Sequence, residues 1–307
     1  MNDKGIRHSG QEIALPTGYA PYALARSPDG SVWVTLVTPG ALGEVDVDAA
    51  LAGADTHSLV VSHRLAGGPA QPMQVTVDAD ATVWYTRSDD RVGRRDAAGS
   101  ESLIELPEGA APYGICTASD GGVWFTAAGL NRVGRVLSDG TLEWTALPLP
   151  DAGPAMLATA GDGTVWVALN AAGALARLSD GDIGIVGLPQ QPATPVGLAA
   201  AGDGVWYADI GGGRVGRVDA AGTVQQVVLP DPDCRPHAVA ADPDGGCWVT
   251  EWAAGQLARI TADGDVAEYP LPGQEPHGLL VTERHVWVAM ESGSLVAVDR
   301  TATAGPD

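Results

Sequence analysis

Short apolar segments separated by tight turns recur along the whole chain. In one stretch the apolar segment Tyr113–Cys116 leads through a turn at Asp120–Gly122 to a second segment, Val123–Thr126. Two further segments, 131–136 and 144–147, follow and flank an Asp-Gly turn. Asp-Gly is typical of hairpin turns because glycine accepts the positive φ that such turns need. The pattern predicts four strands of about five residues in each repeat and leaves no room for long helices.

A proline and a tryptophan mark each repeat. The marker prolines are Pro21, Pro72, Pro112, Pro154, Pro195, Pro236 and Pro276. The marker tryptophans, 11 or 12 residues later, are Trp33, Trp84, Trp124, Trp166, Trp206, Trp248 and Trp287. Units of four strands with a period of about 40 residues are typical of β-propeller blades. The seven repeats therefore predict an all-β, seven-bladed propeller that spans 1–307 as one domain. The equivalent tryptophans are expected to pack between blades.

The two ends of the chain are expected to meet in one blade. The last repeat stops after Leu295–Val298 and lacks an outer strand, whereas Glu12–Pro16 resembles the outer strand Glu268–Pro272. The N-terminal strand is therefore predicted to complete the seventh blade, which removes open sheet edges. The first spacing between marker prolines is 51 residues, and this predicts a loop insertion in blade 1 around Ala49 to Asp55.

Composition and charge exclude several classes of protein. The chain carries 17 Lys+Arg against 38 Asp+Glu, a net charge of −21, which disfavours nucleic acid as a partner. No apolar run is long enough to cross a bilayer. The polar start Met1–Gly10 lacks the apolar core of a secretory signal, and the three cysteines cannot all pair with one another. We therefore expect a cytoplasmic protein without a disulfide framework, and a monomer, since the sequence indicates no dimer interface.

The repeats differ most at the residue that follows each marker proline. These residues are Tyr22, Met73, Tyr113, Ala155, Val196, His237 and His277, so that only the last two blades place histidine there. The residue before the proline is acidic only at Glu275. A hairpin turn centred on Glu283 would place Glu275 and Glu291 opposite each other on paired strands, with His277 on the same side. His237 would join this group from the adjacent blade.

Two carboxylates with no cysteine beside them favour a hard cation such as Mg²⁺, which takes one or two protein carboxylates and keeps several waters. A Zn²⁺ site that uses both histidines and both glutamates is an alternative. A further alternative is that the two Pro-His pairs only cap strands at the surface. The sequence contains no Gly-x-Ser-x-Gly elbow, no phosphate-binding glycine loop and no Cys-x-x-Cys pair.

Four segments give the chain its resemblance to a known family. They are Arg235–Ala238, Thr250–Trp252, Glu275–Gly278 and Ala289–Glu291, and they stand beside the blade motif Asp-Gly-x-Val-Trp-Phe-Thr. With these motifs the chain resembles the virginiamycin B lyase family over essentially its whole length. The resemblance implies a carbon–oxygen lyase of antibiotic resistance, which opens the lactone of streptogramin B type cyclic depsipeptides by elimination, without water.

The resemblance also implies a role for each candidate residue. The counterpart of His277 is the general base, the counterparts of Glu275 and Glu291 hold Mg²⁺, and the counterpart of His237 contacts the substrate. A neutral imidazole and a metal ion suit this reaction, because it removes a proton α to a carbonyl and expels a carboxylate. Tyr22 is expected to offer a flat surface to an aromatic substrate, as is Trp252, with simple packing as the alternative for both.

Two other functions remain open at this point. One is a propeller that binds a partner or serves as a scaffold without chemistry, since the same architecture often serves recognition. The other is a lactone hydrolase of the gluconolactonase type, which would hold a central Ca²⁺ with several Glu, Asn and Asp residues.

The chain also departs from the family at the third residue after each marker tryptophan, where the family more often has Glu. The residues there are Leu36, Arg87, Ala127, Leu169, Asp209, Glu251 and Met290.

Overall fold

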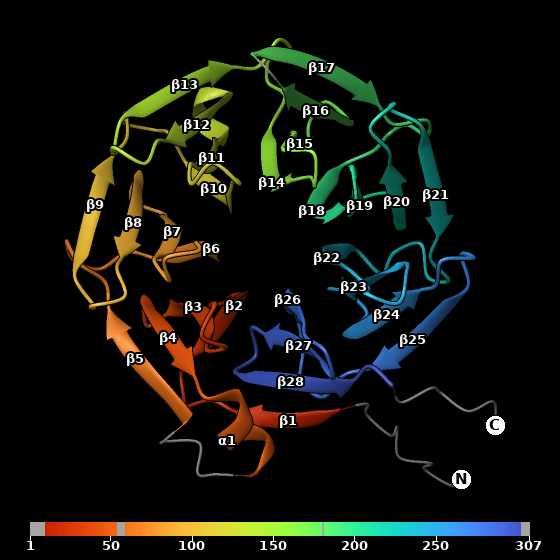
Figure 1. Ribbon diagram of the computed structural model, residues 1–307. Coiled ribbons are helices and arrows are strands. Elements are labelled where there is room, and N and C mark those ends of the chain that lie inside the picture. The colour runs from red at the N-terminus through yellow and green to blue at the C-terminus, as the bar shows by residue number, and fades with distance from the viewer. Residues whose placement is uncertain (1–9, 54–58, 180, 302–307) are drawn as a thin grey trace, which may run out of the picture.

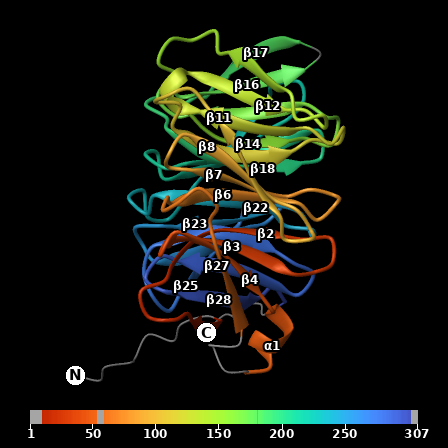
Figure 2. The same cartoon turned by 90° about the vertical axis from the view of Figure 1, so that its left-hand side faces the viewer.

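The computed structural model describes residues 10–53, 59–179 and 181–301. Within this part of the chain, seven four-stranded antiparallel sheets stand side by side around a common centre (Figure 1). Seen edge-on, the ring forms a thick disc, and the strands run across its thickness (Figure 2). The predicted all-β, seven-bladed propeller is confirmed.

In each blade the chain runs from the centre of the ring outward. The innermost strands are β2 (Ala20–Arg26), β6 (Pro72–Val77), β10 (Pro112–Thr117), β14 (Pro154–Thr159), β18 (Pro195–Ala201), β22 (Pro236–Ala241) and β26 (Pro276–Val281). The second strands are β3 (Val32–Thr38), β7 (Val83–Arg87), β11 (Val123–Ala127), β15 (Val165–Leu169), β19 (Gly204–Asp209), β23 (Cys247–Glu251) and β27 (His285–Met290).

The outer half of each blade is more exposed to solvent. The third strands are β4 (Ala41–Val45), β8 (Arg91–Arg95), β12 (Arg132–Val136), β16 (Ala174–Ser179), β20 (Arg214–Val218), β24 (Gln256–Ile260) and β28 (Ser294–Asp299). The outermost strands are β5 (Val60–Arg64), β9 (Glu101–Glu105), β13 (Leu142–Ala146), β17 (Asp182–Gly187), β21 (Val224–Val228), β25 (Val266–Pro270) and, in the seventh blade, β1 (Gln11–Ala14).

The N-terminal strand closes the ring as predicted. The sheet order of blade 7 is β1-β28-β27-β26, with Ile13 opposite Leu295 (Figure 1). Ile13 and Leu295 are both buried in an apolar cluster. This cluster also contains Trp287 of the same blade and Val34 of blade 1. Apolar burial thus fastens the first strand to the last blade.

The insertion in blade 1 differs in part from the prediction. The expected loop contains a short helix, α1 (Val47–Leu51), which begins where the Asp46 carboxylate accepts a hydrogen bond from the backbone N–H of Ala49. Ala50 is buried against the blade, and this contact explains why so short a helix forms. Positions 54 and 55 of the predicted insertion lie outside the described residues. A single 3₁₀ turn, η1 (Ala128–Leu130), lies in blade 3.

The core lies between neighbouring blades, where the marker tryptophans pack. Five of these seven rings are buried, namely Trp33, Trp84, Trp166, Trp248 and Trp287. The other two, Trp124 and Trp206, are partly buried against the next blade. The predicted packing role of the tryptophans is therefore confirmed. All three cysteines are free thiols, in agreement with the prediction of no disulfide framework.

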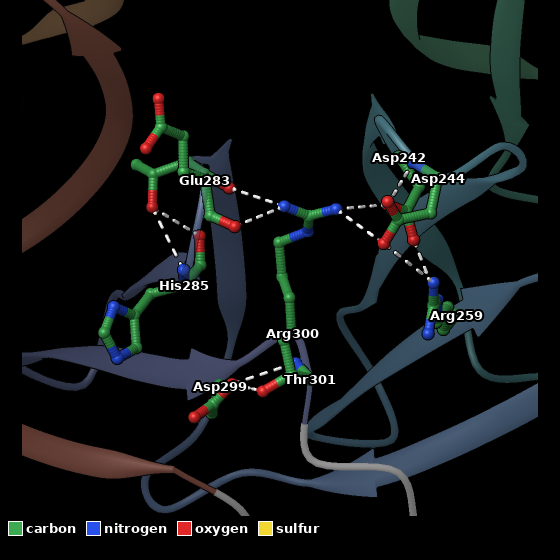
Figure 3. A network of polar contacts seen from close by, with 9 residues as sticks. Asp242, Asp244, Arg259, Glu283, His285, Asp299, Arg300 and Thr301 are labelled. Atoms are coloured by element: carbon green, nitrogen blue, oxygen red, sulfur yellow. Dashed lines mark hydrogen bonds and ion pairs between the residues drawn. The ribbon is translucent and has the colours of Figure 1, made fainter.

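A buried ion-pair network ties blade 7 to blade 6. Arg300, which follows β28, donates to the Asp242 and Asp244 carboxylates at 2.9 Å each, and Arg259 donates to the other Asp242 oxygen at 2.7 Å (Figure 3). The Arg300 guanidinium also donates to the backbone carbonyl of Glu283. The side chains of Asp242 and Arg300 are 0% and 6% exposed, whereas the side chain of Asp244 is 68% exposed. The ion pair between Arg300 and Asp242 therefore joins the last two blades through charges shielded from water.

Candidate active site

A β-bulge follows the marker proline in every innermost strand. In blade 7 the register shifts between Pro276 and Leu279, and corresponding shifts occur in the other six blades. A bulge inserts an extra residue and re-aims its side chain. The residue after the proline therefore leaves the ordinary in-and-out alternation of the strand. His277 and its equivalents owe their position to this repeated irregularity.

A repeated threonine contact fixes the bulged residues. The Thr250 hydroxyl accepts a hydrogen bond from the backbone N–H of Ala238 at 2.9 Å and donates to the backbone carbonyl of His277 at 3.2 Å. The same pair of contacts is made in three other blades by the equivalent threonines, Thr35, Thr86 and Thr126. Thr250 is fully buried, so its hydroxyl couples the innermost strands of blades 6 and 7 in a fixed geometry.

His277 lies at the centre of the predicted site. Its Nε2 atom is 2.6 Å from Oε2 of Glu291. Its ring centroid is 4.4 Å from that of Tyr22, 4.8 Å from that of His237 and 6.2 Å from that of Trp252. Burial lowers the pKa of His277 to about 4, so the imidazole is neutral at neutral pH. The structure brings together His277, Glu291, His237 and Tyr22, as the sequence predicts.

Glu275 and Glu291 lie opposite each other at one end of blade 7, just before β26 and just after β27. The backbone N–H of Glu291 donates to the backbone carbonyl of Glu275 at 3.1 Å, so the predicted pairing is correct. Glu275 has a φ of 57°, a left-handed conformation, and Ala111 and Arg235 share it before their own prolines. The conformation is therefore a feature of the repeat rather than of the site. The Glu275 side chain is exposed to solvent and the Glu291 side chain is 36% exposed.

His237 reaches the site from blade 6. Burial lowers its pKa to about 3, and the neighbouring His277 ring adds to this effect. Its Nε2 atom is 3.5 Å from the Tyr113 hydroxyl, and its Nδ1 atom is buried without a partner among the described residues. Both site histidines are thus held in their uncharged form.

Two tyrosines extend the group across the centre of the ring. The hydroxyls of Tyr22 and Tyr113 are 2.8 Å apart. Burial raises the pKa of both phenols, so each keeps its proton and acts as a hydrogen-bond donor. The sequence prediction missed Tyr113 as a site residue. Its position after the marker proline, shared with Tyr22, His237 and His277, is the signal that would have found it.

A groove of about 620 Å³ opens beside the site, between blades 6 and 7. Its lining includes Trp252, Gln256, Leu271, Gln274 and Glu275. The Nε1 donor of Trp252 is buried and has no acceptor within the described part of the chain, and the Arg235 guanidinium lies over the ring, 5.7 Å from its centroid. The groove thus offers an aromatic surface next to the Glu275 carboxylate.

The donor set suits a hard cation better than a soft one. The two glutamates offer carboxylate oxygens on adjacent strand ends, at a place that water reaches. Among residues 10–53, 59–179 and 181–301, no three His, Cys, Asp or Glu side chains form a ready metal site. One or two carboxylates with the remaining positions filled by water are what Mg²⁺ uses in proteins. The residues present therefore fit Mg²⁺.

Comparison with known proteins decides the family. The profile of the virginiamycin B lyase family matches residues 8–298. The chain belongs to this family. It is 42% identical over 281 residues to the virginiamycin B lyase of Nocardia farcinica, which covers 91% of this chain and 95% of that protein. The expected family and the expected lyase class are confirmed.

Solved structures agree with this assignment. The virginiamycin B lyase of Staphylococcus aureus superposes with a TM-score of 0.88 at 29% identity, over 95% of this chain and 99% of that chain. A catalytically inactive variant of that enzyme, solved with quinupristin, superposes with a TM-score of 0.87 at 28% identity, over the same 95% and 99%. In the described residues of this family member, no helix is both long and apolar enough to span a bilayer.

Proposed function

We propose that this protein linearises streptogramin B type cyclic depsipeptides by β-elimination at the lactone ester. Its membership of the virginiamycin B lyase family supports this substrate class, as does the related enzyme solved with quinupristin. The observation that carries the proposal is the neutral, buried imidazole of His277, hydrogen-bonded to a carboxylate where the innermost strand of blade 7 begins. Such a group can take a proton at neutral pH without first losing one.

The reaction needs no water. A base removes the α proton of the threonine unit, and the C–H electrons form a double bond between the α and β carbons. The bond between the β carbon and the ester oxygen breaks, and its electrons leave with the carboxylate. The ring opens into a linear peptide of unchanged mass.

His277 is the proposed base. Its Nδ1 atom is buried, whereas Nε2 lies on the side of the partly exposed Glu291, so Nε2 is the atom that a substrate can reach. A carboxylate only accepts hydrogen bonds, so in the free protein Nε2 carries the proton of the neutral ring. To act as a base, His277 exchanges this contact for the substrate and shifts its proton to Nδ1. Glu291 then orients the imidazolium that forms.

Glu275 and Glu291 are the proposed ligands of Mg²⁺. When bound there, Mg²⁺ supplies positive charge for the oxygens that become negative as the proton leaves and the ester opens. His237 and Tyr22 are proposed to contact the lactone. The ring of each packs against the ring of His277, and each side chain is an uncharged hydrogen-bond donor or acceptor. The charge of −21 supports a small-molecule substrate rather than a nucleic acid. A cytoplasmic monomer remains a prediction.

Mass spectrometry of the product tests the proposal. The purified protein is incubated with quinupristin and Mg²⁺, with and without a chelator. A linear product with the same mass as quinupristin supports elimination. A product heavier by one water molecule indicates hydrolysis of the lactone instead. His277→Ala is expected to abolish turnover while the far-ultraviolet circular dichroism stays unchanged. Absence of any product with the wild-type protein would favour a non-catalytic binding role.

A further inference from the structure

We infer that Tyr113 is a positioning residue that holds Tyr22 and His237 in place for the substrate. This inference rests on the proposed function. Tyr113 comes from β10 of blade 3, which is not adjacent to blades 1, 6 or 7 (Figure 1). Its hydroxyl nevertheless lies 2.8 Å from the Tyr22 hydroxyl and 3.5 Å from Nε2 of His237. One oxygen atom therefore links side chains from three blades.

The hydrogen-bond capacity of the Tyr113 hydroxyl allows both contacts at once. A phenol oxygen accepts up to two hydrogen bonds and donates one, so Tyr113 can accept from one partner and donate to the other. Whether Nε2 of His237 donates or accepts depends on the tautomer of the imidazole. The contact with Tyr113 therefore biases which ring nitrogen of His237 carries the proton.

The contact between Tyr113 and His237 is long in the free protein. A separation of 3.5 Å is at the outer limit of a hydrogen bond. Hydrogen bonds in active sites are often long before the substrate binds and shorten in the complex. By contrast, the contact with Tyr22 already has the ideal length for two hydroxyls. Tyr113 thus fixes Tyr22 beforehand and is placed to fix His237 when the substrate arrives.

The backbone of Tyr113 is itself held firmly. Its carbonyl accepts a hydrogen bond from the Thr86 hydroxyl at 2.6 Å, and its neighbour Gly114 donates to Thr126 at 2.8 Å. The ring packs against two apolar clusters, one that contains Ala155 and Val196 and one that contains Val75 and Tyr85. These apolar contacts do not involve the hydroxyl. Tyr113→Phe therefore removes the polar link and leaves the packing of the ring in place.

The expected effect is on substrate binding more than on chemistry. Tyr113 acts equally on the bound substrate and on the transition state, because it orients the contact residues and not the base. Loss of one hydrogen bond between neutral groups lowers the specificity constant by about 3- to 10-fold. For Tyr113→Phe we expect most of this loss as a higher KM for quinupristin, with kcat within about 2-fold of the wild type.

A spectroscopic measurement tests the link without any substrate. Nitrogen-15 spectra of the histidine rings in the ligand-free protein report which ring nitrogen carries the proton, with His237 assigned through His237→Gln. Tyr113→Phe is expected to change the tautomer signature of His237. The matched control is Tyr207→Phe, which removes a hydroxyl bonded to Gln226 at 2.6 Å in blade 5. This control is expected to leave the His237 signals and KM unchanged.

The possible outcomes separate this inference from the proposed function. An unchanged His237 signature in Tyr113→Phe overturns the inference, whether or not the wild-type protein acts on quinupristin. A changed signature with an unchanged KM overturns the role in substrate positioning. Equal effects of Tyr113→Phe and Tyr207→Phe would show that loss of any buried hydroxyl loosens the propeller, and would also overturn the inference. Failure of the wild type to convert quinupristin contradicts the proposed function, whereas the spectra still decide whether Tyr113 holds His237.

Discussion

The Nε2 atom of His277 lies 2.6 Å from Oε2 of Glu291, and this contact joins the first two strands of blade 7 at the site. It exists because a bulge follows Pro276: with regular alternation, the side chain at position 277 would follow the ordinary pleat of the strand. The contact pairs a buried ring with a partly exposed carboxylate. The base and one metal ligand of the proposed mechanism are therefore coupled, and removing one affects the other.

The first prediction concerns the two carboxylates. Glu275→Gln and Glu291→Gln keep the shape of the side chain but remove its charge, and each is expected to weaken Mg²⁺ binding. Loss of a residue that merely supports a metal ligand costs about 10- to 100-fold in affinity, and loss of a ligand costs at least that. Calorimetric titration with Mg²⁺ measures the effect directly, and chelation is expected to stop wild-type turnover.

A matched control lies on the same hairpin. Glu283 is exposed at the far turn of blade 7, between β26 and β27. Glu283→Gln changes the net charge by the same amount and is expected to leave Mg²⁺ affinity unchanged. Equal weakening in all three variants would mean that only the overall charge matters, and the assignment of these ligands would then be wrong.

The second prediction concerns the threonine that holds His277. Thr250→Val removes a hydroxyl bonded to Ala238 and to the His277 carbonyl, and is expected to lower kcat by roughly 10-fold because a small displacement of a base is costly. Thr126→Val removes the equivalent contacts, to Gly114 and Ala155. Both variants should lose a similar free energy of unfolding, about 1 to 3 kcal/mol. A comparable fall in kcat for both would argue that stability alone explains the effect.

The repeat made the fold readable from sequence, because a proline, a tryptophan and an Asp-Gly turn recur with the period of a blade. The pairing of Glu275 with Glu291 was also predicted, since it follows from hairpin symmetry. The bulge was not predicted, because a hydrophobic pattern does not reveal one extra residue after a proline. Tyr113 was missed for a related reason: its contacts with Tyr22 and His237 cross the ring, and strand pairing gives no information about distances between blades that are not neighbours.

The third prediction concerns the network that ties the last blades together. Arg300→Met removes the donors to Asp242 and Asp244 and leaves a fully buried carboxylate with Arg259 as its remaining charged partner. Breaking a buried pair costs about 3 kcal/mol. Urea unfolding is expected to show this loss, whereas Arg132→Met, at an exposed arginine of β12, should change the free energy of unfolding by less than about 0.5 kcal/mol. A loss below about 1 kcal/mol for Arg300→Met would mean that Arg259 alone satisfies Asp242.

The last prediction concerns Glu251, a buried carboxyl group at the end of β23. Its side chain is fully buried, and neither carboxyl oxygen has a hydrogen-bond partner in the described part of the chain. Burial raises the pKa of Glu251 from 4.5 to about 7, and the charges of Glu268 and Asp231 add to the shift. The folded protein therefore holds a proton here that the unfolded chain releases between these two values.

The sign of the pH dependence follows from this difference. Where the folded state binds more protons than the unfolded state, stability falls as pH rises. The contribution of protonated Glu251 is fully present below pH 4.5 and is lost as pH rises through about 7. Glu251→Gln cannot titrate, so its stability relative to the wild type should increase by about 3 kcal/mol between pH 4.5 and pH 8. Urea unfolding at several pH values measures the difference, with the exposed Glu108→Gln as control. A difference that does not change with pH would mean that Glu251 is already ionised in the folded protein, and that Cys234 or water stabilises its charge.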